Sequence, residues 1–297
     1  IQGLKGIAQV IFFPGDTVNQ RHYLFHQNTQ LSLPGHPSGN QPSSLQLYYS
    51  VIDPLAANGR GEILSKNNLV INDTLENGNV LAVRHANGRD WWVVVKKFFV
   101  GKFYAILVTP DSVYAPISYT DLSPLGVVGG QACFSPNGNH YASFSSTSQL
   151  RIYDFNRCTG ILDNYRGKFI TNHIAGSTSF SPNSRFLYIS NLDTLWQFDM
   201  QAPDIFMSQT FIAKADSFAF WWHWLAPDGK IYIVGSQLGR KLHIINNPDM
   251  PGLACNFQQH SVALPTYIQG NTSPTPINLA LYQLLGSPCD TLGLGNP

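Results

Sequence analysis

The sequence predicts an all-β protein, a β-propeller of four-stranded antiparallel blades, on the strength of three observations. Charged residues make up only 12% of the 297 residues, aromatic residues make up another 12%, and Gly and Pro are frequent. Strand-forming segments alternate with tight-turn residues along the chain, without convincing helical periodicity. A strand–turn–strand pattern also recurs at about 46 residues, which is near the period of a propeller blade.

The recurring pattern is an apolar strand, a Ser-Pro or Ala-Pro turn and a second strand. It reads QACFSPNGNHYASFSS from Gln131, STSFSPNSRFLYISN from Ser177 and HWLAPDGKIYIVGS from His223. Proline fixes φ at the second turn position, and the Asn or Asp after it turns the chain back into a hairpin. A third strand with alternating apolar and polar residues follows each hairpin, and a more polar fourth strand completes the blade.

Two further blades are expected toward the N-terminus, one containing VLAVRHANGRDWWVVVKKF and one running from AQVIFFPGD to NLVINDT. The five expected blades cover residues 7–76, 80–122, 129–171, 177–214 and 218–264. We expect residues 1–264 to form the propeller and residues 265–297 to form an irregular closing segment. A large β-sandwich or a β-helix is the alternative, but a period of about 40–46 residues exceeds the rhythm of a sandwich.

Composition and motifs argue against several function classes. A formal net charge of +1 gives no basic field for nucleic acid, and no run of about 18 apolar residues is present to insert into a membrane. The four cysteines lack metal-type spacing, and the sequence has no Gly-rich phosphate loop, HExxH motif or calcium loop. We therefore expect no metal, no cofactor, no nucleic-acid partner and no direct membrane insertion.

Two aromatic clusters stand out, at Trp91-Trp92 and from Phe220 to Trp224. Strand alternation sends adjacent rings to opposite sheet faces, so the main interpretation is that they pack in the core. The alternative is that a ring at a strand end stacks on a sugar. On that hypothesis the candidate ligand-binding residues are Trp91, Trp222 and Trp224.

The HANGRDWW segment places His85, Arg89 and Asp90 around one turn. A carboxylate that accepts hydrogen bonds from Arg or His would make this turn rigid, and we prefer this structural interpretation. A general base at His85 beside Asp90 is the catalytic alternative, but no nucleophile or paired carboxylate accompanies it. No residue is therefore predicted to be catalytic.

As a set, several segments resemble propeller-containing secreted or cell-surface proteins of the phylum Bacteroidota that are associated with type IX secretion or gliding motility. The matching segments include GEILSKNNLVIND, AVRHANGRDWWVVVKKF, YDFNRCTG, LAPDGKIYIV, INNPDMPGLACNF and GSPCDTLG. Such proteins usually have a further blade and a C-terminal sorting domain. The resemblance therefore implies six or seven blades in the full-length protein, and export to the extracellular space or the outer cell surface.

The resemblance also gives a meaning to the triplet of Asp, then Ser or Thr, then an aliphatic residue. This triplet looks like the O-glycosylation sequon of exported Bacteroidota proteins. The predicted glycosylated residues are Thr17, Thr74, Ser112, Thr194 and Thr291. The alternative is that the Asp-Thr pairs only cap turns at strand ends.

Export into an oxidising compartment makes disulfides plausible. We predict a bond between Cys255 and Cys289, which would tie the closing segment to the last blade. Whether Cys133 and Cys158 pair with each other stays open, since one lies in a first strand and the other in a turn.

The preferred functional hypothesis is a non-catalytic binding or scaffold module for a protein or glycan partner at the cell surface. One alternative is an extracellular carbohydrate-active enzyme, a propeller lyase or hydrolase working in the central channel. Another is a cargo or accessory subunit of an outer-membrane secretion or motility assembly. Fold alone does not decide among them.

Overall fold

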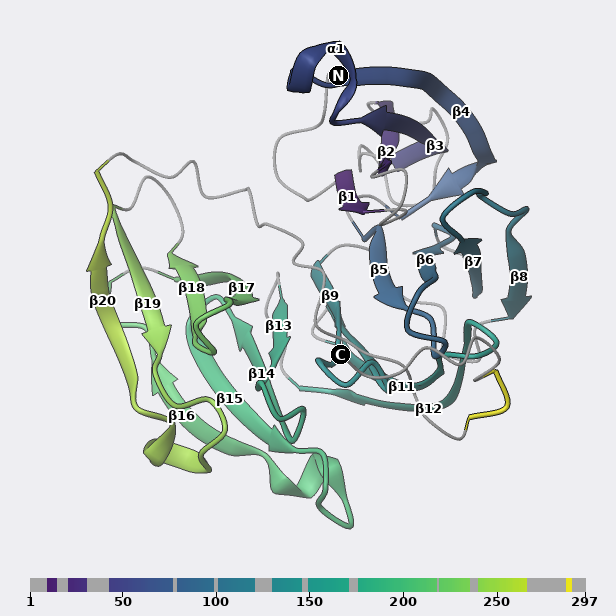
Figure 1. The fold of residues 1–297 in the computed structure, drawn as a ribbon. Helices are drawn as coiled ribbons and strands as arrows, with labels where there is room; N and C mark the ends of the chain where they lie inside the picture. The colour runs from purple at the N-terminus through teal and green to yellow at the C-terminus, as the bar shows by residue number, and fades with distance from the viewer. Residues whose placement is uncertain are drawn as a thin grey trace. The chain divides into compact units, whose positions relative to one another are not determined.

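The computed structural model describes the chain except for residues 1–9, 15–20, 31–42, 77–78, 99–100, 121–129, 146–148, 171–175, 218, 236–239, 266–286 and 290–297. The described residues form five sheets, and each sheet consists of four consecutive antiparallel strands (Figure 1). Each expected blade range contains one sheet. The prediction of an all-β fold with four-stranded blades is therefore confirmed.

The first sheet consists of β1 (Val10–Pro14), β2 (His22–Gln30), β3 (Ser43–Asp53) and β4 (Glu62–Leu75), and the second of β5 (Leu81–Arg84), β6 (Trp91–Lys96), β7 (Lys102–Val108) and β8 (Ile117–Thr120). The third consists of β9 (Gly130–Phe134), β10 (His140–Ser145), β11 (Gln149–Asn156) and β12 (Ile161–Phe169). The fourth consists of β13 (Ser177–Phe180), β14 (Phe186–Asn191), β15 (Thr194–Asp199) and β16 (Thr210–Lys214), and the fifth of β17 (Phe220–Leu225), β18 (Ile231–Gly235), β19 (Lys241–Ile245) and β20 (Phe257–Ala263). Three short helical turns accompany them: α1 (Ala56–Gly59), η1 (Ile205–Ser208) and η2 (Gly252–Cys255).

The contacts within the chain divide it into two compact units. One unit contains residues 1–125, 155–163 and 277–297, and the other contains residues 126–154 and 164–276. The turn that joins β11 to β12 therefore groups with the first two sheets. Among the described segments, no helix is long and apolar enough to cross a membrane.

Two of the middle strands, β6 and β14, are buried on both faces. All six residues of β14 are buried, and five of the six residues of β6 are buried. Strands in this position need apolar side chains on both faces rather than on alternate residues. This explains why WWVVV in β6 and FLYIS in β14 read as continuous apolar runs.

The repeated Ser-Pro-Asn turns are stabilised by the same side-chain contacts in two blades. Ser135 Oγ lies 2.6 Å from Asn137 Oδ1 and accepts a hydrogen bond from the backbone N–H of His140 at 2.9 Å. Ser181 makes the equivalent contacts in the next blade, with Asn183 Oδ1 at 2.7 Å and the Phe186 N–H at 2.9 Å. The serine hydroxyl thus stabilises the hairpin turn that contains the Pro-Asn pair.

Each of these turns also contacts the blade that follows it in sequence. The Asn137 N–H donates to Ser184 Oγ in the turn of the next blade at 3.0 Å. The Asn183 N–H in turn donates to Asp249 Oδ1 at 2.9 Å, in the loop between β19 and η2. Neighbouring blades of this unit are therefore joined through the amides of their turns.

A glutamine side chain joins the first strands of the same three blades. Gln131 in β9 donates from Nε2 to the carbonyl oxygen of His223 at 2.5 Å. Its Oε1 accepts from the backbone N–H of His223 in β17 at 3.1 Å and of Thr178 in β13 at 3.4 Å. The side-chain amide of Gln131 thus hydrogen-bonds to backbone groups on two other strands. These groups lie at strand edges that pair with no further strand in the described part of the chain, so they would otherwise lack a hydrogen-bond partner.

The turn between β11 and β12 is held against the β5–β6 turn. The Arg157 carbonyl accepts from Trp92 Nε1 at 2.8 Å and from the Ala86 N–H at 3.1 Å. The Arg157 guanidinium donates from Nε to the Arg84 carbonyl at 2.9 Å. His85 Nε2 lies 3.1 Å from the Cys158 carbonyl oxygen. These long-range contacts explain why residues 155–163 belong to the first unit.

The disulfide prediction was wrong. Cys289 is bonded to Cys158, and their Cα atoms lie 5.6 Å apart, within the ordinary span of a disulfide. Cys255 is free and fully buried among apolar residues of the fourth and fifth sheets, and Cys133 is also free. Sequence proximity favoured Cys255, but Cys255 is enclosed in the core, whereas Cys158 lies half-buried in a turn.

We expect Gly160→Ala to lower the free energy of unfolding by about 3 kcal/mol, since left-handed strain and a steric clash add. Gly160 has a φ of +74°, and a Cβ atom there would lie 2.7 Å from the Trp92 ring. Gly59→Ala is the matched control, because Gly59 has a φ of +80° and no atom of the described residues lies within 4 Å of the added carbon. Urea unfolding of both variants measures the difference, and equal losses would show that the Trp92 contact has no effect.

Candidate functional site

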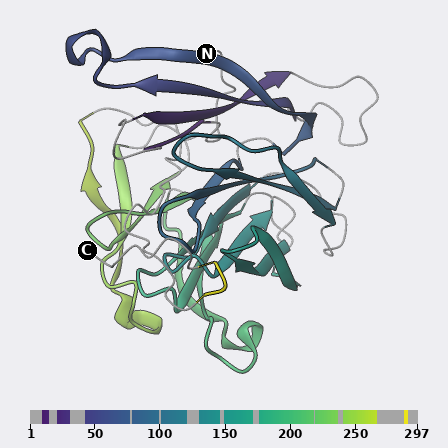
Figure 2. The ribbon, with the colours of Figure 1, turned by 45° about the vertical axis from the view of Figure 1, so that its right-hand side comes forward.

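Four large apolar side chains are exposed on three neighbouring elements of the second unit. Met207 on η1 is 79% exposed and Leu253 on η2 is 77% exposed, while Phe211 on β16 and Met250 before η2 are each about half exposed. η1 packs against β15, β15 pairs with β16, and β16 contacts η2. Both helical turns lie at the same end of these strands (Figures 1 and 2). We call these four residues the η1–β16–η2 surface.

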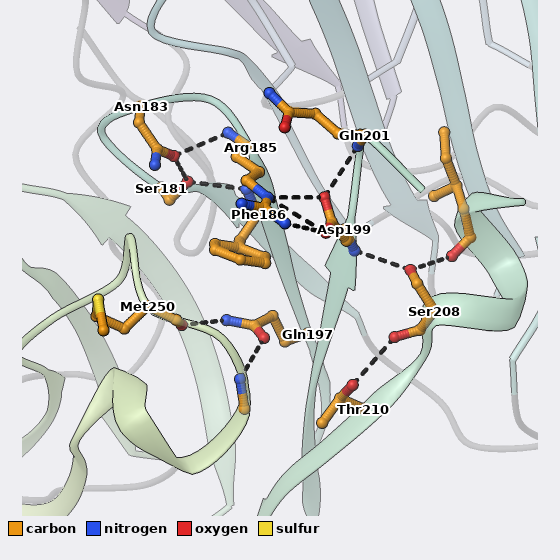
Figure 3. A network of polar contacts seen from close by, with 12 residues as sticks. Ser181, Asn183, Arg185, Phe186, Gln197, Asp199, Gln201, Ser208, Thr210 and Met250 are labelled. Carbon is orange, nitrogen blue, oxygen red and sulfur yellow. Dashed lines mark hydrogen bonds and ion pairs between the residues drawn. The ribbon is translucent and has the colours of Figure 1, made fainter. Parts of the chain in front are cut away.

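Hydrogen bonds fix the turn that carries Met207. Asp204 caps η1, and its Oδ1 accepts from the N–H groups of Phe206 at 2.9 Å and Met207 at 3.3 Å. Ser208 Oγ donates to the Ile205 carbonyl at 2.6 Å and accepts from the Asp199 N–H at 2.8 Å (Figure 3). Met207 therefore protrudes from a turn whose backbone is tied to the end of β15.

Gln197 fixes the loop that carries Met250 and Leu253. Its Nε2 donates to the Met250 carbonyl at 2.8 Å, and its Oε1 accepts from the Gly252 N–H at 2.7 Å (Figure 3). The buried Tyr188 hydroxyl accepts from the same Nε2 and donates to the Pro248 carbonyl at 2.8 Å. One buried glutamine on β15 thus positions the whole Pro-Asp-Met-Pro-Gly loop.

An ion pair lies at the end of β15, close to η1. Arg185 donates to both carboxylate oxygens of Asp199, with Nη2 at 2.8 Å from Oδ2, and Asp199 Oδ1 also accepts from the Gln201 N–H at 2.9 Å (Figure 3). The hydrogen bonds from Arg185 hold the pKa of the Asp199 carboxyl below its usual value. The ion pair therefore lies at the end of β15, to which Ser208 of η1 is also hydrogen-bonded, and polar groups of this kind commonly surround the apolar centre of a protein interface.

Two of the three tryptophans named as candidate ligand-binding residues lie in the core, as the main interpretation of the aromatic clusters expected. Trp91 and Trp222 are buried, and the Arg84 guanidinium lies 4.6 Å from the centre of the Trp91 ring. A buried ring offers no face for a sugar, so the structure supports core packing for these two. Trp224 is partly exposed and stacks on Tyr232 at 5.8 Å, so its ligand-binding role stays a prediction.

Three of the predicted glycosylation residues lie in the described part of the chain. Thr74 and Thr194 are partly buried, and Thr194 Oγ1 donates to Asp193 at 3.1 Å. Ser112 lies exposed in a turn and therefore has the most accessible hydroxyl of the three. Thr17 and Thr291 lie outside the described residues.

The HANGRDWW turn has the structural network that its sequence predicts. Asp90 accepts from Arg89 Nε at 2.6 Å and from Asn87 Nδ2 at 2.7 Å. His85 lies against the β11–β12 turn, and burial lowers the pKa of its imidazole. These groups are occupied in holding two turns together.

A cluster of Asp216, Ser217 and His260 has the residue types of a hydrolytic triad but a different geometry. Asp216 Oδ1 and Ser217 Oγ both approach the same ring nitrogen, His260 Nε2, at 2.6 and 3.3 Å. In a triad, the acid and the nucleophile contact opposite ring nitrogens, so that the histidine can take the proton of the hydroxyl. Here the Asp216 carboxylate contacts the same ring nitrogen, His260 Nε2, that would have to accept the proton of the Ser217 hydroxyl.

The sequence contained no signal for the η1–β16–η2 surface. Met207 and Phe211 read as ordinary strand or turn residues, and PDMPG reads as a loop. The position of the PDMPG loop depends on the contacts of Gln197 with Met250 and Gly252, which are more than fifty residues away in sequence. A strand pattern cannot reveal such contacts.

Comparisons with known proteins bear on the fold. No protein-family model matches the sequence, and no curated protein was matched. A solved structure from Lactobacillus plantarum is similar over 86% of this chain and 72% of its own, with 16% identity and a TM-score of 0.52.

Two further solved structures are similar, each with 13% identity. A provisionally named 6-phosphogluconolactonase from Bacteroides uniformis has a TM-score of 0.49 over 86% of this chain and 85% of its own. The periplasmic gluconolactonase of Pseudomonas aeruginosa has a TM-score of 0.48 over 87% and 84%. Neither likeness bears on what this chain binds or catalyses. The five sheets and the Lactobacillus plantarum structure establish a β-propeller fold of four-stranded antiparallel blades.

Proposed function

We propose that the chain is a binding module that holds a protein partner on the η1–β16–η2 surface. The observation that carries this proposal is the exposure of Met207 and Leu253 on turns fixed by hydrogen bonds. Large apolar side chains gathered at a surface commonly mark sites of protein interaction, and methionine adapts its shape to a partner. Turns that are ordered before binding also lose less conformational entropy on association.

A protein partner fits this surface better than a glycan. Sugar sites need exposed aromatic faces together with hydrogen-bonding groups, and the surface has one aromatic ring, Phe211, among three aliphatic or thioether side chains. The Arg185–Asp199 pair at the end of β15 favours a partner with complementary polar groups around an apolar centre.

We further propose that the module is exported. The Cys158–Cys289 bond supports an oxidising compartment, where disulfides persist. The resemblance to exported Bacteroidota propellers supports the same location, with a sugar on the Ser112 hydroxyl. Membership of an outer-membrane secretion or motility assembly is one form that the partner could take.

A photocrosslinking amino acid at position 253 or 207, introduced in the cells that make the protein, is expected to capture one discrete protein partner. The same amino acid at Lys241, an exposed polar position of the same unit, is the control. Met207→Asp introduced together with the crosslinker at 253 is expected to abolish the adduct, because a carboxylate would have to be buried in the interface.

Equal labelling at positions 253 and 241, or an adduct that survives Met207→Asp, would contradict the proposed surface.

Protein purified from the cells that naturally make it tests the proposed export. We expect the protein in the medium or at the cell surface, with added mass on the Ser112 peptide. Recovery from the cytoplasm with the bare polypeptide mass would contradict that location.

A further inference from the structure

Four cysteines and three methionines hold all the sulfur of the chain, and each of them lies in the part that the structure describes. Cys158 and Cys289 are joined in a disulfide. Cys133 and Cys255 are free, but burial raises the pKa of the Cys133 thiol to about 12 and also raises that of the Cys255 thiol. Peroxides attack the thiolate rather than the neutral thiol, so both free cysteines are poor targets for oxidation.

The three methionines differ in how much of the side chain solvent can reach. Met200 is partly buried against the apolar cluster of the third and fourth sheets. Met207 is 79% exposed and Met250 is 48% exposed, and both belong to the η1–β16–η2 surface. A thioether does not have to lose a proton before it reacts, so exposure decides which methionine an oxidant reaches. The sulfur that a peroxide can readily oxidise is therefore concentrated on this one surface.

Hydrogen peroxide oxidises the thioether of methionine to a sulfoxide. The O–O bond of the peroxide breaks, one oxygen atom forms an S–O bond, and the other leaves as water with both hydrogens of the peroxide. The sulfur loses two electrons, and the peroxide gains them. The product is polar and has an oxygen that accepts hydrogen bonds, whereas the thioether is apolar.

The turns that carry Met207 and Met250 are held through their backbone groups. Asp204 accepts a hydrogen bond from the Met207 N–H at 3.3 Å, and Gln197 donates one to the Met250 carbonyl at 2.8 Å. The Met250 side chain points away from Gln197 (Figure 3). Oxidation of the two sulfur atoms removes none of these hydrogen bonds, so we expect η1 and the PDMPG loop to keep their structure.

A sulfoxide on this surface would oppose the burial of its apolar side chains. The side chains of Leu253 and Phe211, which complete the surface with the two methionines, carry no hydrogen-bond donor. A partner shaped for thioethers would have to enclose the sulfoxide oxygens without donors, which costs free energy. We propose that Met207 and Met250 are oxidation sites, and that their conversion to sulfoxides by hydrogen peroxide switches off partner binding at the η1–β16–η2 surface. The switch rests on the proposed function of that surface.

The test uses purified protein with the photocrosslinking amino acid at position 253. One half is treated with hydrogen peroxide and then with catalase, and both halves are added to a lysate of the cells that naturally make the protein. Peptide mapping is expected to find sulfoxide at 207 and 250 before 200, with an unchanged melting temperature. We expect the yield of the partner adduct to fall at least about tenfold. An adduct that survives complete oxidation of both methionines, or oxidation of Met200 at the same rate, would overturn the switch alone. Absence of an adduct from the untreated half would overturn the proposed function as well.

Leucine substitutions identify the sulfur atoms that are responsible. Met207→Leu combined with Met250→Leu removes both thioethers at similar volume, so peroxide is expected to leave the adduct yield of this variant at its own untreated level. Met200→Leu is the matched control, and peroxide is expected to lower its adduct yield as in the wild type. A loss of adduct in the peroxide-treated double variant would assign the effect to another group and overturn the switch. The wild-type comparison decides the proposal even if the double variant captures no partner.

Discussion

Acidification from pH 7 to pH 5 is expected to lower the free energy of unfolding by about 4 kcal/mol, because two histidines are buried in uncharged form. Burial lowers the pKa of His223 to about 3 and that of His243 to about 4, from an ordinary value of 6.5. Both side chains are fully enclosed in the fifth sheet. His223 Nε2 lies 2.8 Å from Ser190 Oγ, a contact that the neutral ring makes without a counter-charge.

Stability falls on acidification because the unfolded chain binds more protons than the folded chain. Below pH 6.5 the unfolded chain protonates both imidazoles while the folded chain keeps them neutral, so protons favour unfolding. The stabilisation is fully present above pH 6.5. As the pH falls from 6.5 toward 4 and 3, it decreases by about 1.4 kcal/mol per pH unit for each histidine.

Urea unfolding at pH 7, 6 and 5 measures this dependence. His223→Gln keeps a hydrogen-bonding group but cannot titrate, so it is expected to reduce the loss between pH 7 and pH 5 by about 2 kcal/mol, whatever its stability at pH 7. A free energy of unfolding that stays constant between pH 7 and 5 would show that the buried histidines are already charged or exposed.

Cys158→Ser is expected to lower the free energy of unfolding by about 4 kcal/mol, since the bond to Cys289 closes a long loop in the unfolded chain. The two cysteines are 131 residues apart, and the entropy lost by the unfolded chain grows with the length of the closed loop. Reduction of the wild-type protein is expected to have the same effect.

Cys255→Ala is the matched control, because it removes a buried free thiol without breaking a bond. We expect it to cost about 1 kcal/mol, from the loss of packing alone. Peptide mapping without reduction is expected to recover residues 158 and 289 in one linked species. A linked pair of 255 and 289 would restore the original sequence-based prediction and contradict the structure.

The blades could be predicted from the sequence because local signals agree with the tertiary structure. Pro182 and Asn183 make a turn that any chain of this sequence would favour, and alternation on both sides predicts paired strands. The bounds of the fourth sheet, from Ser177 to Lys214, coincide with the predicted blade. Turn-forming residues and the alternation of apolar and polar residues in a strand are properties of a few neighbouring residues, so a single sequence is enough to recognise them.

The candidate site and the disulfide could not be predicted, since both depend on contacts between distant residues. Gln197 reaches Met250 and Gly252 across more than fifty positions of sequence. Cys158 meets Cys289 because the turn that carries it is held against Trp92 and His85. The preference for Cys255 rested on its position in the last blade before the closing segment, which does not say which thiol is accessible.

The amide contacts between successive turns imply that the blades are not interchangeable. The Asn137 N–H donates to a hydroxyl on the blade that follows it, whereas the Asn183 N–H donates to a carboxylate in a loop between later strands. Each contact runs in one direction, from a donor on one repeat to an acceptor on the next. A duplicated third blade would carry the Asn137 donor to a copy that has Gly138 in place of Ser184 and therefore lacks the acceptor hydroxyl. The chain thus encodes the order of its repeats in residues that a motif search would count only as turn formers.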